Sequence, residues 1–524
     1  MTLFLAAACG LVQAATEWKP KDIWHGSNLL GMFLYDHKAC SGRFYEWDFA
    51  VLEKYGFNFA RLPVDYRFFS KGKDHWYEID ESKLPRLDEA VAFGRKHRIH
   101  VQICFHRIPG YTVAAYQLEK HNLFRDPEAL DAACRYWACL AKRYRGVPND
   151  ELSFNLFNEP SLSVAAQCGY SGAKRYAEII RILVKAIRDE DPDRFVMADG
   201  LNSGGGYIPV PGLDDIPNLG WATRGYNPTS VSHYGAGWMG LANAPKPVWP
   251  FDPDAPIGVC EGPGRETRGR LELIDLPPCT VAISFSHGVA TRAKIRATAD
   301  GKIVKEERLV PSADAPGWTN VHVDPKWKNT IGSYTGRVEI VLANGAKNLT
   351  IENAEGEWAC SKSCLITSAD GKHAFDLKLS PQFRQPLNFR QRFAGWMAPK
   401  SFRPVDETGA FVKRRYPDDS RECLYRLEFK ALDELNLKDK VVMAGEFGVY
   451  KHTPHEMAMD FLKAYFELWK ERGMGWASWG FRGDMGVINS ERKDVEYETV
   501  PEGKLDRQML ELYRRYMDKG DASL

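Results

Sequence analysis

One stretch decides the fold, and it reads Ser153-Phe154-Asn155-Leu156-Phe157-Asn158-Glu159-Pro160. It is a short apolar run with the length of a buried strand, and it ends in Asn-Glu-Pro. Because proline cannot donate to a hydrogen-bond ladder, we expect the strand to stop at Pro160. Asn158 and Glu159 then lie at its C-terminal tip. In an α/β barrel that tip belongs to the face that carries the active site.

Similar apolar runs alternate with amphipathic helical stretches on both sides of this segment. The connections are too long for hairpins, which predicts parallel strands joined by right-handed crossovers. A doubly wound sheet is the alternative, but no Gly-rich phosphate loop follows any of the runs. The predicted strands are 23–30, 57–64, 99–106, 153–160, 195–200, one near 222–226, 441–446 and 475–480, and the predicted helices are 42–55, 87–97, 127–145, 176–188, 424–435, 455–472 and 505–517.

The sequence pattern changes between the sixth and the seventh predicted strand. Residues 246–270 are rich in Pro, Gly and Asp, and short alternating runs replace the helical periodicity from 271 to 380. Three turn dipeptides lie among these runs, as tight hairpins require: Asp300-Gly301, Asn344-Gly345 and Asp370-Gly371. This pattern predicts a β-sandwich.

We therefore predict the α/β class, with a (β/α)8 TIM barrel and a β-sandwich inserted between strand 6 and helix 6. The barrel is expected to comprise 16–250 and 400–524, and the insertion with its linkers 251–399. Strand-to-helix loops lie on the catalytic face and tolerate such insertions.

Composition excludes some classes of partner. Hydrophobic residues make up 44% of the chain and charged residues 27%, which is ordinary for a globular protein. The net charge is +1, so no broad positive field favours nucleic acid or an anionic membrane. The 15 Trp and 22 Tyr favour a carbohydrate cleft, because aromatic faces pack on sugar rings, although a large aromatic core would have the same composition.

Residues 1–15 have the apolar core of a secretory signal peptide, with a small-residue cleavage site at 12–14, although the usual positive charges are missing. We expect a signal peptide and a secreted, periplasmic or cell-surface protein. The 11 cysteines are scattered without CxxC pairs, so no metal site is expected. Cys104, Cys134 and Cys139 are interpreted as inert core thiols, and whether Cys360 pairs with Cys364 is left open.

Two carboxylates stand at predicted strand ends, Glu159 after the fourth strand and Glu446 after the seventh. Glycoside hydrolysis uses such a pair: one carboxyl group protonates the leaving oxygen, and the other attacks the anomeric carbon or activates water. The structural alternatives are a salt-bridged loop residue for Glu446 and a helix N-terminal carboxylate for Glu159. Two glutamates at the tips of two strands of one barrel favour catalysis.

Around these carboxylates the sequence resembles glycoside hydrolase family 5, the cellulase family. The resemblance covers about 20–245 and 416–518 and does not extend to the insertion. It implies a (β/α)8 barrel and a retaining mechanism. The matching segments are 59–64, 105–111, 157–160, 444–448 and 476–479.

The resemblance also implies roles for individual residues. Glu159 is the expected general acid/base and Glu446 the expected nucleophile, held ionised by Arg61. Asn158 is expected to bind the sugar 2-hydroxyl and Tyr226 to hydrogen-bond the nucleophile. The expected substrate-binding residues are Arg61, His106, Asn158, Tyr226, His233 and Trp479. Structural roles stay open for Arg61 as an interior ion pair and for His106 and Trp479 as core residues.

One position departs from the family pattern. Arg224 stands where the family has a histidine, two residues before Tyr226, and His233 is a candidate to supply the imidazole from a later position. This departure puts the geometry around the sixth strand in question. Trp238 and Trp249 are candidate sugar platforms, with packing as the equal alternative.

Together these observations predict a retaining endo-β-1,4-glycanase of the endoglucanase type, acting on β-linked plant polysaccharide through a glycosyl-enzyme intermediate. A β-mannanase, a xyloglucanase, an exo-acting β-glycosidase and a non-catalytic glycan-binding barrel are the alternatives. The expected partner is a polysaccharide or oligosaccharide, without cofactor or metal, nucleic acid or membrane, and the expected state is a monomer. The insertion is expected to be structural, with carbohydrate binding through Trp318, Trp327, Tyr334 and Trp358 as the alternative.

Overall fold

The computed structural model describes residues 17–38, 40–113, 119–161, 172–202, 207–242, 244, 246–247, 249–250, 259–261, 270–324, 328–378, 388–393, 396, 403–404, 420–435, 437 and 439–517. The predicted signal peptide at 1–15 and the candidate platform Trp327 lie outside these residues. Within them, no helix combines the length and the apolar character that a membrane crossing requires. The chain divides into two compact units, one of 1–249 with 419–524 and one of 250–418.

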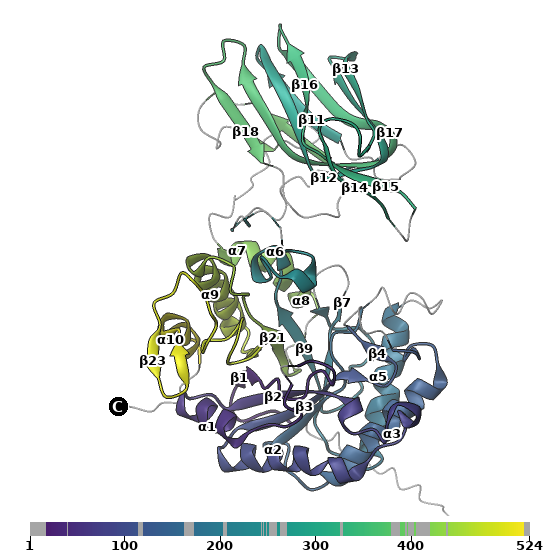
Figure 1. The fold of residues 1–524 in the computed structure, drawn as a ribbon, viewed down its shortest axis with the longest axis vertical. Coiled ribbons are helices and arrows are strands. Elements are labelled where there is room, and N and C mark those ends of the chain that lie inside the picture. The colour runs from purple at the N-terminus through teal and green to yellow at the C-terminus, as the bar shows by residue number, and fades with distance from the viewer. Residues whose placement is uncertain are drawn as a thin grey trace, which may run out of the picture. The chain divides into compact units, whose positions relative to one another are not determined.

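The first unit is a closed barrel of eight parallel strands, which confirms the predicted (β/α)8 architecture (Figure 1). Each strand pairs with its neighbours in chain order, and the last strand pairs with the first, so the sheet has no open edge. The strands are β1 (His25–Asn28), β2 (Phe59–Asp65), β3 (His100–Ile108), β5 (Leu152–Asn155), β6 (Val196–Asp199), β9 (Leu219–Gly225), β21 (Val442–Phe447) and β22 (Gly475–Ser478).

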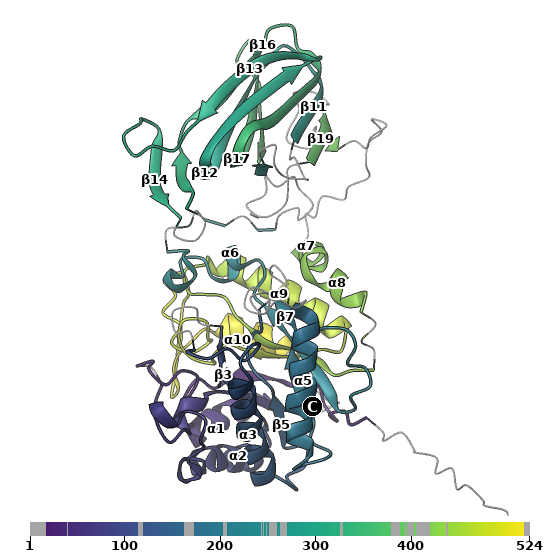
Figure 2. The same ribbon diagram turned by 90° about the vertical axis from the view of Figure 1, so that its right-hand side faces the viewer.

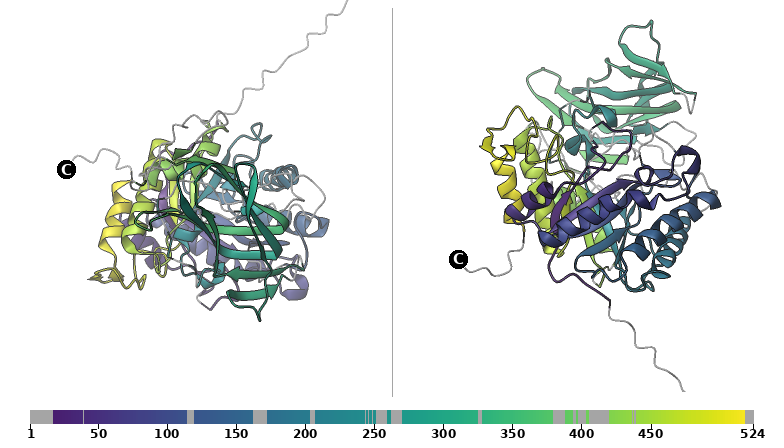
Figure 3. Two further views of the ribbon diagram at one scale, coloured as in Figure 1. Left: turned by 90° about the horizontal axis from the view of Figure 1, so that it is seen from above. Right: turned by 60° about the horizontal axis from the view of Figure 1, so that its bottom comes forward.

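Helices form the outer layer around these strands (Figure 2; Figure 3, right). Their apolar side chains recur every three or four residues and face the barrel; α5, for example, buries Tyr176, Ile179, Leu183 and Ile187. The helices are α1 (Glu46–Lys54), α2 (Pro85–Lys96), α3 (Pro127–Arg143), α5 (Gly172–Arg188), α6 (Thr229–Ser232), α7 (Ser420–Leu424), α8 (Lys430–Asp433), α9 (His455–Glu471) and α10 (Arg507–Arg515). A π-helical turn, Tyr425–Phe429, joins α7 to α8 where one helix was predicted.

Proline does not end the strands in the way predicted. Strand β5 ends at Asn155, and the chain turns away at Glu159, whose φ of +52° is left-handed, before it reaches Pro160. The second proline at a predicted strand end, Pro63, would by the same rule close the strand 57–64, but it lies inside β2. The backbone carbonyl oxygen of Arg61 accepts from the Leu29 N–H, just after β1 ends. Pro63 lies two residues further along β2, so its backbone nitrogen faces the same side of the strand, at a level beyond the end of β1. No ladder donor is needed there.

The close approach of β1 to β2 depends on Gly26. A Cβ atom at this position would lie 1.7 Å from the carbonyl oxygen of Phe59, its register partner. We expect Gly26→Ala to force the two strands apart and to destabilise the barrel by about 3 kcal/mol or more. Urea unfolding followed by tryptophan fluorescence measures this loss. Gly237→Ala is the matched control, since nothing lies within 4 Å of its added Cβ, and an equal effect in both variants would contradict the prediction.

The second unit is built mainly of antiparallel strands that follow β9, which agrees with the predicted all-β insertion after strand 6. The short runs predicted between 271 and 380 are in part joined into longer strands. The longest are β12 and β17, which pair with each other over most of their length (Figure 1). The strands are β10 (Val259–Glu261), β11 (Arg270–Leu276), β12 (Cys279–Ala299), β13 (Lys302–Leu309), β14 (Trp318–Val323), β15 (Thr330–Tyr334), β16 (Arg337–Leu342), β17 (Ala346–Ser368), β18 (Ala374–Lys378), β19 (Asn388–Arg392) and β20 (Arg403–Pro404).

Two of the three turn dipeptides, Asp300-Gly301 and Asp370-Gly371, lie between paired strands, as predicted. Asn344-Gly345 instead joins β16 to β17, which both pair with β12. Gly301, Gly345 and Gly371 all have positive φ, the conformation that tight hairpins require. Residues from both ends of β12 and β17 contribute to one apolar core. Cys360 and Cys364 do not pair with each other, because four residues of extended strand place their Cα atoms about 13 Å apart, beyond disulfide reach.

Candidate active site

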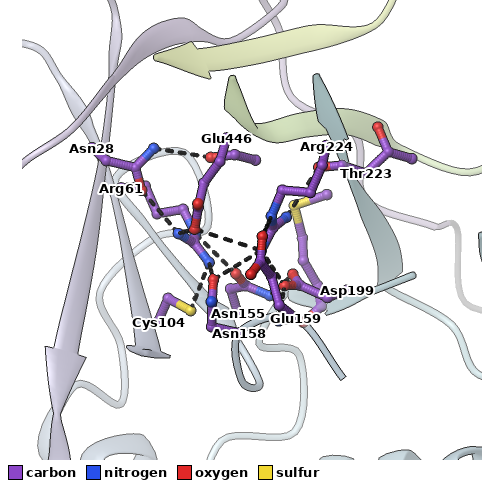
Figure 4. A network of polar contacts seen from close by, with 12 residues as sticks. Asn28, Arg61, Cys104, Asn155, Asn158, Glu159, Asp199, Thr223, Arg224 and Glu446 are labelled. Carbon is purple, nitrogen blue, oxygen red and sulfur yellow. Dashed lines mark hydrogen bonds and ion pairs between the residues drawn. The ribbon is translucent and has the colours of Figure 1, made fainter. Parts of the chain in front are cut away.

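A network of charged and amide side chains lies at the C-terminal ends of the barrel strands (Figure 4). Glu159 follows β5, and Glu446 is the penultimate residue of β21. Between them lie Arg61 from β2, Asp199 from the last position of β6, and Arg224 from β9. Two guanidinium groups thus meet three carboxyl groups in a region where Arg61 and Asp199 are fully buried.

Arg61 orients Glu446, the residue predicted to be the nucleophile. Its Nη1 atom donates to Glu446 Oε1 at 2.6 Å and to Asn28 Oδ1 at 2.8 Å. Its Nε atom donates to Asn155 Oδ1 at 3.0 Å, and Nη2 donates to Cys104 Sγ at 3.0 Å. A guanidinium whose donors are engaged in this way fixes the carboxyl group beside it in position.

Arg224 contacts both candidate catalytic carboxyl groups. Its Nε atom donates to Glu159 Oε1 at 3.0 Å, and its Nη2 atom lies 3.6 Å from Glu446 Oε1. Nη2 also donates to Asp199 Oδ2, and Nη1 donates to the Thr223 carbonyl oxygen at 3.0 Å. The position that departs from the family pattern therefore lies between the two carboxyl groups.

The backbone of Glu159 is held on both sides. Its N–H donates to Asp199 Oδ2 at 2.8 Å, and its carbonyl oxygen accepts from the Tyr111 hydroxyl at 2.6 Å. The left-handed φ of this residue is unusual for a side chain other than glycine, and these two hydrogen bonds hold it there. The turn points the Glu159 side chain toward Arg224 (Figure 4).

The Glu159 carboxyl lies in a buried position that favours its protonated form. Its side chain is only 14% exposed. This burial, followed by the nearby Glu446 carboxylate, raises the pKa of Glu159 to about 7, although Arg224 acts in the opposite direction. An acid catalyst works best when its pKa lies near the working pH.

Asn158 contacts both guanidinium groups through its side-chain oxygen and keeps its side-chain NH2 group available for a ligand. Its Oδ1 atom accepts from Arg61 Nη2 and from Arg224 Nη2, each at 2.9 Å. Its buried Nδ2 atom has no hydrogen-bond partner within the described structure. A buried amide without a partner costs free energy, so a ligand oxygen at this position would satisfy it.

The predicted aromatic and imidazole residues surround this network. The Tyr226 hydroxyl donates to Glu446 Oε2 at 3.3 Å, and His106 stacks on Trp479 with ring centroids 5.4 Å apart. Burial lowers the pKa of His106 to about 3, so its imidazole is neutral. His233 packs edge-on against the Tyr226 ring at 4.9 Å, and no described contact links it directly to Glu159.

The outlying tryptophans separate into exposed and packed positions. Trp238 is 57% exposed and lies edge-on against Tyr450 at 4.7 Å. Trp249 packs on Phe461 and donates from Nε1 to Asp460 Oδ2 at 3.0 Å, which favours its packing role. In the second unit, Trp318 and Tyr334 pack on each other with ring centroids 5.0 Å apart.

Sequence reasoning missed several members of this network. Asp199 is the penultimate residue of the predicted fifth strand, 195–200, and the last residue of β6, and its position near a strand tip was the available signal. Cys104 was interpreted as an inert core thiol, yet it accepts from Arg61. Asn28 and Asn155 carried no motif, because their part in the site depends on pairing between strands that lie far apart in the sequence.

Comparison with known proteins confirms the predicted resemblance. Residues 45–238 match the family model described as cellulase, glycosyl hydrolase family 5. Endoglucanase 3 of Fibrobacter succinogenes (strain ATCC 19169 / S85) is 23% identical over 229 residues, which is 42% of this chain and 33% of that protein. The chain thus spans about a third of the length of this relative. A crystal structure of a glycoside hydrolase shares the fold, with a TM-score of 0.58, 21% identity and coverage of 95% of this chain and 100% of that one.

Proposed function

We propose that this chain, in which residues 45–238 match glycoside hydrolase family 5, is a retaining endo-β-1,4-glycanase. One observation carries the proposal: the two strand-end glutamates occupy different environments. Glu446 accepts a 2.6 Å hydrogen bond from a fully buried guanidinium, while the pKa of Glu159 is raised to about 7. Such a pair supplies one carboxylate and one carboxylic acid at the same pH.

In the first step, the Glu446 carboxylate attacks the anomeric carbon of the bound sugar. The bond between that carbon and the leaving oxygen breaks, and the leaving oxygen takes the proton of Glu159. The Tyr226 hydroxyl and Arg61 hold the two oxygens of Glu446, so that the attack needs little reorganisation. The products are a glycosyl ester on Glu446 and an ionised Glu159.

In the second step, Glu159 acts as the base. It takes a proton from a water molecule, the water oxygen bonds to the anomeric carbon, and the electron pair of the ester bond returns to Glu446. Two displacements at one carbon restore its original configuration. Proton NMR of the first-formed product tests this assignment, because retention gives the β anomer and inversion gives the α anomer.

A β-1,4-glucan is the proposed substrate. The support is the likeness to a relative named Endoglucanase 3, together with the family match. A panel of soluble β-glucan, mannan and xyloglucan with product sizing tests both the backbone and the mode of attack. Mixed oligosaccharides from glucan would support endo action on glucan. A single small product would support exo action instead, and a preference for mannan or xyloglucan would make that polysaccharide the substrate.

The unpartnered Nδ2 atom of Asn158 is proposed to bind the sugar 2-hydroxyl. Asn158→Asp retains Oδ1 for the two arginines and loses this donor. We expect kcat/KM on an aryl β-cellobioside to fall about 100-fold, because hydrogen bonds to the 2-hydroxyl strengthen in the transition state. On the matching 2-deoxy substrate the same variant should lose less than about fivefold. An equal loss on both substrates would contradict the assignment.

A further inference from the structure

Arg224 and Asp199 form an ion pair that is buried beside the proposed acid/base. Arg224 is 3% exposed and Asp199 is fully buried. Their contact is direct, from Arg224 Nη2 to Asp199 Oδ2, and Asp199 Oδ1 is oriented by Asn155 Nδ2 at 2.9 Å. Each partner also contacts Glu159, Arg224 through the side chain and Asp199 through the backbone N–H.

This ion pair does not have the form of a site for an anionic substrate group. Arg224 already donates to Glu159, Asn158, Asp199 and the carbonyl of Thr223. A substrate carboxylate would have to displace one of these partners, and it would then lie beside the carboxyl groups of Asp199 and Glu446. The geometry points instead to an effect on Glu159 itself.

We propose that Arg224 and Asp199 are a pair of positioning residues that set the proton affinity of Glu159 in the two halves of the reaction. Arg224 provides the positive charge that stabilises ionised Glu159 when it must act as base. Asp199 offsets that charge, so that Glu159 keeps its proton until the first step. This inference rests on the proposed retaining mechanism and deepens it.

Glu159 must hold its proton before the first step and must be ionised in the second step. These opposite requirements explain why a positive charge and a negative charge are placed together beside it. Before the first step Glu446 is negative, and its charge helps Glu159 to retain the proton. After Glu446 becomes an ester that charge is gone, while Arg224 remains beside Glu159. The guanidinium then favours the ionised base without any movement of the protein.

Other charged and titratable groups also face Glu159, and the test must separate their effects from those of the pair. Glu446 on β21 and the Arg61 guanidinium on β2 lie across the site. Three tyrosines also interact electrostatically with Glu159: Tyr111 on β4 (Tyr111–Thr112), Tyr207 on β8 (Tyr207–Ile208) and Tyr226 after β9. His106 and His233 have lowered pKa values and stay neutral at pH 7. None of these residues is changed in the variants below.

The test is the pH dependence of kcat/KM in the full-length chain for Asp199→Asn and Arg224→Gln, measured on soluble β-glucan. The basic limb reports loss of the Glu159 proton. Asp199→Asn leaves the Arg224 charge unopposed and should move this limb down by about one pH unit. Arg224→Gln removes the cation and should move it up by about the same amount. Limbs that stay in place, or that move in the same direction, would overturn the proposal.

Two further variants keep the proposal falsifiable if a single change prevents folding, since loss of one partner leaves a buried charge uncompensated. Arg224→Lys keeps the charge and should leave the limb within about 0.3 pH units of the wild type. The double variant Asp199→Asn/Arg224→Gln should return the limb close to the wild-type position. Arg224→Gln should also slow the second step, because it removes the cation that favours ionised Glu159, so that kcat on a dinitrophenyl cellobioside falls about tenfold while kcat/KM falls less than about threefold.

The outcome for the pair is separable from that for the proposed function. If wild-type enzyme yields the β anomer from glucan while the limbs do not shift, the pair has no such role and the retaining mechanism stands. If the wild type yields the α anomer, the retaining mechanism fails, and the inference about the pair fails with it. An Arg224→Gln variant that loses kcat and kcat/KM equally on the dinitrophenyl substrate would show a structural role only and would overturn the proposal.

Discussion

Glu446→Gln is expected to lose hydrolytic activity on soluble β-glucan by about ten-thousand-fold or more, because the amide cannot form the glycosyl ester. The variant keeps the size of the side chain and an oxygen that can accept from Arg61 Nη1, which lies 2.6 Å from Oε1 in the wild type. Initial rates of reducing-sugar release measure the loss, and circular dichroism checks that the barrel is intact.

Glu151→Gln is the matched control for this variant. Glu151 immediately precedes β5, at the opposite end of the strand that leads to Glu159, and it pairs with Arg95 at 34% side-chain exposure. Exchange of a solvated carboxylate there should leave the rate within about twofold of the wild type. A folded Glu446→Gln enzyme that keeps more than about a hundredth of the wild-type rate would contradict the nucleophile assignment.

Glu159→Gln is the second large effect, and its size should depend on the leaving group. On β-glucan the leaving oxygen needs a proton, and we expect a loss of about a thousandfold. On a dinitrophenyl β-cellobioside the leaving group departs without one, so kcat/KM should fall less than about tenfold. Comparison of kcat/KM on the two substrates measures this difference, with Glu151→Gln again as the control.

The pH profile gives an independent reading of the same residue. Glu159 is active in its protonated form and its pKa is raised to about 7, so the wild-type rate on glucan should fall as the pH rises through about 7. Glu159→Gln cannot lose a proton and should lack this basic limb. A variant that retains the limb, or that loses activity equally on both substrates, would rule out Glu159 as the acid.

The position of the two glutamates could be predicted because their strands carry strong local signals. The alternation of apolar runs and amphipathic helices predicts a barrel, and barrel topology places every strand tip on one face. The prediction failed where local rules were used for exact boundaries. The chain turns at Glu159 through a left-handed φ before it reaches Pro160. Pro63 is accommodated inside β2 because its nitrogen faces the side where β1 has already ended.

The network around the glutamates could not be predicted in the same way, because its contacts join residues on different strands. Arg224 was noticed only as a departure from a motif, and its partner Asp199 carried no motif at all. Their contact depends on the register of β6 against β9, in which Asp199 pairs with Ala222 two residues before Arg224. Local sequence does not encode that register, whereas the closed barrel does.

The most direct test of the central claim is to trap the glycosyl-enzyme intermediate. A 2-deoxy-2-fluoro β-cellobioside with a dinitrophenyl leaving group slows both steps, and the good leaving group lets the covalent intermediate accumulate. Peptide mass spectrometry then locates the sugar. We predict one glycosyl group on the peptide that contains Glu446, and none in Glu446→Gln. A sugar on any other residue, or turnover of the unfluorinated substrate with no trapped adduct, would contradict the proposed mechanism.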